Sequence, residues 1–263
     1  MDIKIIYEDK DLLVVDKPAG VVVFPEGQTL INGEKTLIDY LIEKYPELKN
    51  VGEAPRYGIV HRLDKDTSGI LLVAKDPEAL IFLQKQFINT SVLSTSLGNK
   101  NCDSSPLALL DNRRVEKKYV CLVVGAMESD SGTIKTLIAR AKGDPRKQRA
   151  YSPINAPKSA REAITEYKVI EKFKDYTLLE VQIKTGRRHQ IRCHLSYLKH
   201  PIAGDKLYGF KNQPIPENLT RQFLHASYLK IQLPPNGDRP NGKTEEFNSE
   251  LPEELKQVLD KLK

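Results

Sequence analysis

Short apolar runs separated by polar turns dominate the first part of the chain. Ile3 to Tyr7 and Leu12 to Asp16 are predicted strands, because both are rich in strand-forming residues and a turn-like segment, Glu8 to Asp11, separates them. A further apolar run, Ile70 to Lys75, follows the polar, charged stretch His61 to Gly69. This order predicts a strand that displays reactive groups at its start.

Apolar residues recur at helical spacing in four other segments. These segments are Thr36 to Tyr45, Pro77 to Phe87, Arg187 to Leu198 and Pro252 to Leu262. Pro46 ends the first helix, and Asp76 suits the N-cap of the second. Further strands are predicted at Lys118 to Val124, Ile164 to Ile170, Thr177 to Lys184 and Tyr228 to Leu233. Many strands with few helices favour an α+β fold: a single domain over residues 1–263 with a mixed, largely antiparallel sheet flanked by helices.

One segment, Asn89 to Arg114, breaks this pattern. It is rich in Ser, Asn, Thr and Leu and has no sustained period. Because loops of that length are uncommon in compact domains unless they are functional or mobile, we predict an insertion at about residues 89–114.

Charge and composition narrow the class of protein. Lys and Arg number 41 against 35 Asp and Glu among 263 residues, a net charge of +6. The surplus is uneven, since eight basic residues and one acid lie between Lys135 and Arg161. Such a stripe is typical of a surface for a polyanion such as nucleic acid, although a solvated loop explains it equally well.

Membrane and secreted proteins are disfavoured. No apolar run approaches the length of a membrane span, and the start of the chain lacks the long apolar region of a signal peptide. Three scattered cysteines, Cys102, Cys121 and Cys193, do not form a disulfide framework. We therefore predict a cytoplasmic protein that does not bind a membrane.

The stretch before the third strand carries the first candidate chemistry. Asp64 stands between Arg62 and Lys65, and a cationic setting keeps a carboxylate ionised, as a nucleophile, a base or an electrostatic stabiliser requires. Asp64 and Asp66 could share acid and base duties, as in glycosidases, but two residues in one tight loop are poorly placed to flank a bond. Asp66 is more typical of a turn that ends at Gly69.

The second candidate is the segment Gly186 to His194. His189 and Cys193 are four residues apart and so share one helical face, but two ligands are weak support for a metal site, and we predict none. The cations near a predicted helix start, where the helix dipole disfavours them, are Arg187, Arg188 and Arg192. Their position therefore predicts a phosphate or carboxylate nearby.

Several blocks of sequence, in this order, carry a resemblance to a known family. They are Val14 to Gly20, Gly58 to Gly69, Lys117 to Tyr119, Gly186 to Leu195, Pro201 to Asp205 and Leu224 to Ala226. Over nearly its whole length the chain resembles the RluA-type family of RNA pseudouridine synthases. These enzymes detach uracil from its ribose, rotate it and rejoin it through carbon, without a cofactor or metal. The resemblance implies the pseudouridine synthase fold and a structured RNA substrate, either rRNA or tRNA.

The same resemblance assigns three catalytic residues. Asp64 matches the catalytic carboxylate, as a nucleophile or as a base. Tyr119 matches the family's active-site tyrosine, whose ring can stack on the uracil. Arg192 matches the arginine that pairs with the catalytic Asp and keeps it charged.

Four further residues are expected to bind RNA. Arg62 is the candidate for the space left when the target nucleotide flips out, and Lys17, Arg187 and Arg188 are expected to contact the RNA backbone. Arg188 replaces the Thr that is usual in the family pattern.

The remaining expectations concern the insertion, the domain content, the oligomeric state and the alternative activities. The segment Asn89 to Arg114 is longer than the short connection expected between a helix and a strand. We expect either that it contacts RNA or a partner, or that it is a passive loop. No separate N-terminal RNA-binding domain is expected, and the protein is expected to be a monomer. Two alternatives stay open: a catalytically inactive RNA-binding or remodelling protein, and glycoside hydrolysis by Asp64 and Asp66.

Overall fold

The structure is a computed structural model that describes residues 3–26, 32–87 and 115–263. The predicted insertion at about residues 89–114 lies outside the described residues.

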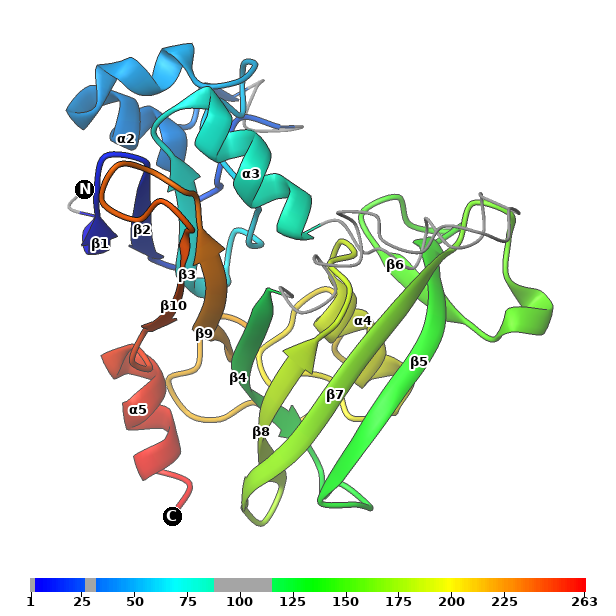
Figure 1. The fold of residues 1–263 in the computed structure, drawn as a ribbon. Helices are drawn as coiled ribbons and strands as arrows, with labels where there is room; N and C mark the ends of the chain where they lie inside the picture. The colour runs from blue at the N-terminus through cyan, green and yellow to red at the C-terminus, as the bar shows by residue number, and fades with distance from the viewer. Residues whose placement is uncertain (1–2, 27–31, 88–114) are drawn as a thin grey trace.

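One ten-stranded sheet organises the molecule. Its strands are β1 (Lys4–Glu8), β2 (Leu12–Lys17), β3 (Ser68–Ala74), β4 (Glu116–Val124), β5 (Ser131–Arg140), β6 (Gln148–Tyr151), β7 (Arg161–Lys172), β8 (Tyr176–Ile183), β9 (Leu224–Leu233) and β10 (Lys243–Asn248). They lie in the order β1-β2-β3-β9-β4-β8-β7-β5-β6, with β10 paired to β9 (Figure 1). Among the strand pairs of the described residues, β3 and β9 run parallel and the others antiparallel. The predicted α+β fold with a largely antiparallel sheet is confirmed.

The four predicted helices are all present. They are α2 (Leu37–Lys44), α3 (Pro77–Phe87), α4 (Gln190–Tyr197) and α5 (Glu253–Asp260), with short 3-10 turns η1 (Pro46–Asn50) and η4 (Pro153–Asn155). The side chain of Asp76 accepts a hydrogen bond from the Ala79 amide at 2.8 Å, which is the expected N-cap contact. No helix within the described residues is long and apolar enough to cross a bilayer.

Helix α4 begins later than predicted. His189, just before it, has a φ of 54°, a left-handed conformation that interrupts the helical path. Arg187 and Arg188 therefore lie in the turn before the helix, and the prediction that they belong to its first turn is wrong.

Strands at the centre of the sheet have apolar residues at successive positions because both of their faces are buried. In β2, Leu13 and Val15 face the cluster that contains α2, while Leu12 and Val14 face the cluster that contains α3. Burial of both faces favours an unbroken apolar run over alternation. Helices α2 and α3 thereby clamp β2 and β3 and fix the loop that leads into β3.

The contact between β3 and β9 places that loop over the middle of the sheet. Gly69 has a φ of +114°, and a Cβ atom there would lie 2.2 Å from the carbonyl oxygen of Ala226. Only glycine permits this approach. The loop from His61 to Thr67 consequently ends beside β9 and β4, near the centre of the sheet (Figure 1).

Three strands were not predicted: β5, β6 and β10. Strand β10 is mostly polar and buries Phe247. It forms because β3 pairs with only the first residues of β9 and leaves the rest of that side to β10. Strands β5 and β6 form a hairpin that carries much of the basic stretch Lys135 to Arg161. Half of its basic residues lie in strands and half in the connecting turns, so the stretch is part sheet and part exposed loop.

Candidate active site

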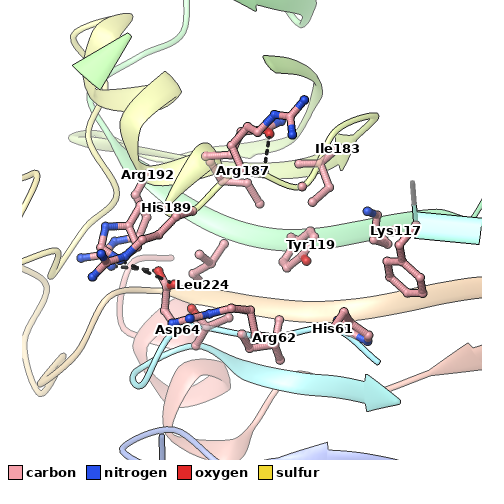
Figure 2. A pocket seen from close by; sticks show the side chains of 17 residues that line it. His61, Arg62, Asp64, Lys117, Tyr119, Ile183, Arg187, His189, Arg192 and Leu224 are labelled. Atoms are coloured by element: carbon pink, nitrogen blue, oxygen red, sulfur yellow. Dashed lines mark hydrogen bonds and ion pairs between the residues drawn. The ribbon is translucent and has the colours of Figure 1, made fainter. Parts of the chain in front are cut away.

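A pocket of about 520 Å³ lies between the loop before β3, the strand β4 and the turn before α4. Figure 2 shows Asp64, His189 and Arg192 together at one end, Tyr119 in the middle, and His61 and Lys117 at the other end. Most of the residues predicted from sequence line it, namely Asp64, Tyr119, Arg192, Arg62, Arg187 and Arg188.

Asp64 and Arg192 meet at one end of this pocket. Arg192 Nη1 donates to Asp64 Oδ2 at 2.9 Å, although the two residues are 128 positions apart in sequence. The Asp64 side chain keeps 19% of its surface exposed and the Arg192 side chain 10%. The expected contact is present, and the carboxylate stays open to the pocket.

Arg192 is held by a second carboxylate that sequence reasoning missed. Its Nε and Nη2 donate to the two oxygens of Asp205 at 2.7 and 2.9 Å, and the Asp205 side chain is fully buried. Burial alone would raise the pKa of Asp205, but the hydrogen bonds and charge of Arg192 hold it below its usual range. The amides of Leu207 and Tyr208 donate to the same carboxylate. Asp205 thus fixes the guanidinium that faces Asp64.

His189 is the other group beside Asp64. Burial lowers the pKa of His189 to about 4, so the ring is neutral at pH 7. The Tyr208 hydroxyl accepts from the Gln148 amide at 2.6 Å and lies 3.1 Å from His189 Nδ1. Its own proton is therefore available to Nδ1, which leaves the ring proton on Nε2, 3.8 Å from Asp64 Oδ1. The network assigns His189 as a neutral donor directed at Asp64.

Tyr119 forms the floor of the pocket from β4. The residue is buried, and burial together with the charge of Asp64 raises the pKa of its phenol. No hydrogen bond to its hydroxyl occurs within the described part of the chain. A neutral ring in this position can stack on a planar base.

Lys17 does not reach the pocket. It is fully buried, and its ammonium donates to the carbonyl oxygens of Pro18, Val21 and Lys65 at 2.8, 2.8 and 3.0 Å. The prediction that Lys17 contacts the RNA backbone is therefore wrong in this structure. The lysine instead ties the end of β2 to the loop that carries Asp64.

The three other cations expected to bind RNA differ in the partners that their guanidinium groups already have. The guanidinium of Arg62 forms a two-pronged ion pair with Glu26 and lies 5.4 Å from the ring centroid of Phe24. Arg187 donates through Nε to the carbonyl oxygen of Glu162 at 3.0 Å, and Arg188 is exposed. Arg187 and Arg188 keep nitrogen donors for phosphates, whereas the charge of Arg62 is already balanced by Glu26.

The turn after Asp64 is held by distant side chains. The Gln222 amide donates to Thr67 Oγ1 at 2.8 Å, and Arg221 donates to the Asp66 carbonyl oxygen and to Ser68 Oγ. Asp66 itself is exposed and does not line the pocket. A paired role for Asp64 and Asp66, as glycoside hydrolysis requires, is not supported by this arrangement.

The histidine and cysteine considered as metal ligands face different surroundings. Cys193 is buried in an apolar cluster with Ile138 and Ala163, away from Asp64. Within residues 3–26, 32–87 and 115–263, no group of three or more potential ligands forms a metal site.

Known proteins resemble this chain over its whole length. A sequence model of the family described as RNA pseudouridylate synthase matches residues 11–197. An uncharacterized RNA pseudouridine synthase of Bacillus subtilis, YlyB, is 35% identical over 100% of this chain and 74% of its own length. The ribosomal large subunit pseudouridine synthase D of Pseudomonas aeruginosa is 35% identical over 100% of this chain and 72% of its own length.

A solved structure supports the fold. The human RNA pseudouridylate synthase domain containing 4 superposes with a TM-score of 0.66 at 24% identity, covering 98% of this chain and 92% of that one. At that identity the likeness concerns the fold alone. The match of the family model and the relatives at 35% identity decide the assignment: the chain belongs to the RNA pseudouridine synthase family.

Proposed function

We propose that this enzyme converts one or more specific uridines of ribosomal RNA to pseudouridine, with Asp64 as its catalytic carboxylate. The observation that carries the proposal is an accessible carboxylate, fixed by Arg192, beside the ring of Tyr119 in a pocket of about 520 Å³. A volume of that order accommodates a small ligand such as a flipped nucleoside. Ribosomal RNA is preferred over transfer RNA because several relatives are named ribosomal large subunit pseudouridine synthase D.

The reaction requires few groups. The bond between ribose C1′ and uracil N1 breaks with its electron pair on N1, and the base rotates. C5 then bonds to C1′, the C5 proton leaves and N1 takes up a proton, so that no atom is gained or lost. Asp64 either bonds to C1′, in an ester that C5 later displaces, or removes a ribose proton that it later returns, and Arg192 holds the carboxylate in place through its hydrogen bond. Tyr119 holds the detached base by stacking, which is worth about 1–3 kcal/mol. Since the product is an isomer, we propose that neither a cofactor nor a metal takes part.

We extend the proposal to the whole protein. The described strands share one sheet, which supports a single catalytic domain. Cys121 and Cys193 are free and buried, as suits a reducing compartment, so we propose a cytoplasmic location. That the protein is a monomer stays a prediction. RNA would approach over Arg187 and Arg188 at the pocket rim.

A catalytically inactive RNA-binding protein is the second candidate. It would have no need of the costly burial of Arg192 and Asp205 behind Asp64. The intact Asp64, Tyr119 and Arg192 therefore favour the enzyme.

The test compares two neighbouring carboxylates. Pseudouridine is mapped across the total RNA of a deletion strain. This strain is complemented with the wild-type protein, with Asp64→Asn or with Asp66→Asn. We expect Asp64→Asn to lower the single-turnover rate at least about 1,000-fold while RNA binding persists. Asp66→Asn, whose side chain is exposed outside the pocket, should retain the wild-type rate. Full activity of Asp64→Asn would refute the catalytic assignment, and sites confined to transfer RNA would refute the substrate.

A further inference from the structure

Lys117 lines the pocket at the end opposite Asp64 (Figure 2). It stands two residues before Tyr119 on β4, so both side chains point to the same face and lie roughly 7 Å apart along the strand. Gly186 lies across from it, and a Cβ atom on that glycine would be 3.8 Å from Lys117 Nζ. Figure 2 shows Tyr119 between Asp64 and Lys117.

The ammonium of Lys117 has no counterion among the described residues. The ammonium lies over the ring of Phe87, with Nζ 5.1 Å from the ring centroid. His61 stacks on the same ring, and its Nε2 accepts a hydrogen bond from the Leu72 amide at 3.2 Å, so the imidazole is neutral with its proton on Nδ1. Lys118, the next residue, differs: it lies within 4 Å of both Glu116 and Glu180, on the other face of the strand.

A desolvated cation without a partner is costly to hold in a folded protein. Burial lowers the pKa of Lys117 to about 8, which leaves most of the side chain protonated at pH 7. Charged groups in such settings cluster at functional sites, where a ligand supplies the missing charge.

We propose that the Lys117 ammonium donates a hydrogen bond to an exocyclic oxygen of the target uracil and stabilises the negative charge on the detached base. This inference rests on the proposed isomerisation. A uracil whose ribose lies at Asp64 and whose ring stacks on Tyr119 directs O4, on the ring atom opposite N1, toward Lys117. The phosphates belong to the RNA backbone and stay at the pocket mouth, on the side of the ribose.

The chemistry of the base fits a single fixed cation. When the C1′–N1 bond breaks, the electron pair left on N1 spreads onto O2 and O4. Rotation of the ring about its N3–C6 axis exchanges N1 with C5 and at the same time O2 with O4. The ammonium consequently meets an equivalent oxygen before and after the rotation, and its interaction is strongest while the base carries the charge.

The test compares Lys117→Met with Lys118→Met on a ribosomal RNA that the wild type modifies. We expect Lys117→Met to lower the single-turnover rate of pseudouridine formation about 100-fold or more, with a dissociation constant within about threefold of the wild type. Lys118→Met should match the wild type in both. If the wild type forms no pseudouridine, the proposed function fails. If the wild type is active and Lys117→Met is equally active, only the role of Lys117 fails.

Two outcomes would overturn the role of Lys117. One is an unchanged rate in Lys117→Met; the other is weaker binding at an unchanged rate, which assigns the ammonium to an RNA phosphate. Lys117→Arg retains the charge and should recover a large part of the rate. This result would show that Lys117→Met is slow because it lacks the positive charge, not because it misfolds.

A pH profile gives an independent readout. The titratable neighbours in the pocket do not change charge between pH 6 and 9: burial lowers the pKa of His61 to about 3 and raises that of the Tyr119 phenol, and Arg187 keeps its charge. The wild-type rate should therefore decline above about pH 8, and Lys117→Arg should move that decline beyond pH 9. If the wild type and Lys117→Arg have the same pH profile, the inference is contradicted.

Discussion

At the scale of single residues, the decisive feature is the division of the Arg192 guanidinium between two carboxylates. The sequence placed Arg62 and Lys65 beside Asp64, yet these side chains pair with Glu26 and Glu34. The resemblance to a family pointed to Arg192, and the contact is present. Asp205 could not be predicted, because its role depends on a tertiary contact and its own segment resembles an ordinary turn.

This division predicts that Asp205 matters more for stability than Asp64 does. Asp205→Asn leaves a buried guanidinium without its main counter-charge, a loss that typically costs about 3–5 kcal/mol. Asp64→Asn removes a partly exposed partner and should cost less. Urea unfolding of the two variants measures the difference.

The same pair of variants separates positioning from catalysis. Asp205→Asn should retain a measurable rate, since Asp64 is intact, while Asp64→Asn should retain almost none. Equal destabilisation by the two substitutions would contradict the view that Asp205 anchors Arg192.

At the scale of elements, the loop that carries Asp64 is held from three directions. Lys17 binds the Lys65 carbonyl oxygen from the end of β2, the Gly20 amide donates to the same oxygen at 2.9 Å, and Arg221 and Gln222 hold the following turn. The sequence identified the loop as the centre of the site but misplaced Lys17 on the RNA. A lysine beside a motif looks like a phosphate ligand until its burial is known.

We predict that Lys17→Met destabilises the protein by about 2–4 kcal/mol, because three buried carbonyl oxygens lose a charged donor. The rate of isomerisation should fall with it, since the Asp64 loop loses an anchor. Lys10→Met, at an exposed position, is the matched control and should be neutral. Wild-type stability with weaker RNA binding in Lys17→Met would restore the phosphate contact.

Elements with a clear period could be predicted, and those without one could not. The helices have strong spacing and identifiable ends, such as Asp76 and Pro46. Strand β10 has little apolar content and exists because β9 pairs with it, and the late start of α4 follows from the conformation of His189. Both depend on contacts that a local pattern does not contain.

At the scale of the whole molecule, neutral histidines occur in both halves of the sheet and in the active site. His194 connects α4 to Thr136 of β5 and Thr165 of β7 at 2.9 and 2.8 Å, His189 faces Asp64, and His61 bonds to the amide of Leu72 in β3. Burial lowers the pKa of His61 to about 3 and those of His189 and His194 to about 4.

These pKa values predict a loss of stability in mild acid. In the unfolded chain the three histidines titrate near pH 6.5, well above their pKa values in the folded protein. As the pH falls from about 6.5 toward 4, the unfolded chain therefore binds more protons than the folded one, and the free energy of unfolding decreases. The slope approaches about 1.4 kcal/mol per pH unit for each histidine.

Urea unfolding between pH 8 and pH 5 tests this link between burial and stability. The range stays above the acid region in which carboxylates such as Asp205 titrate. Burial also lowers the pKa of Lys17 to about 7 and lowers that of His225, so a histidine variant is needed to isolate the contribution of one imidazole. His194→Gln retains a side chain that can bond to Thr136 and Thr165 but does not titrate, and its slope should be smaller by about one proton. A stability that is equal at pH 7 and pH 5 would mean that these imidazoles are protonated as easily in the folded protein as in the unfolded chain.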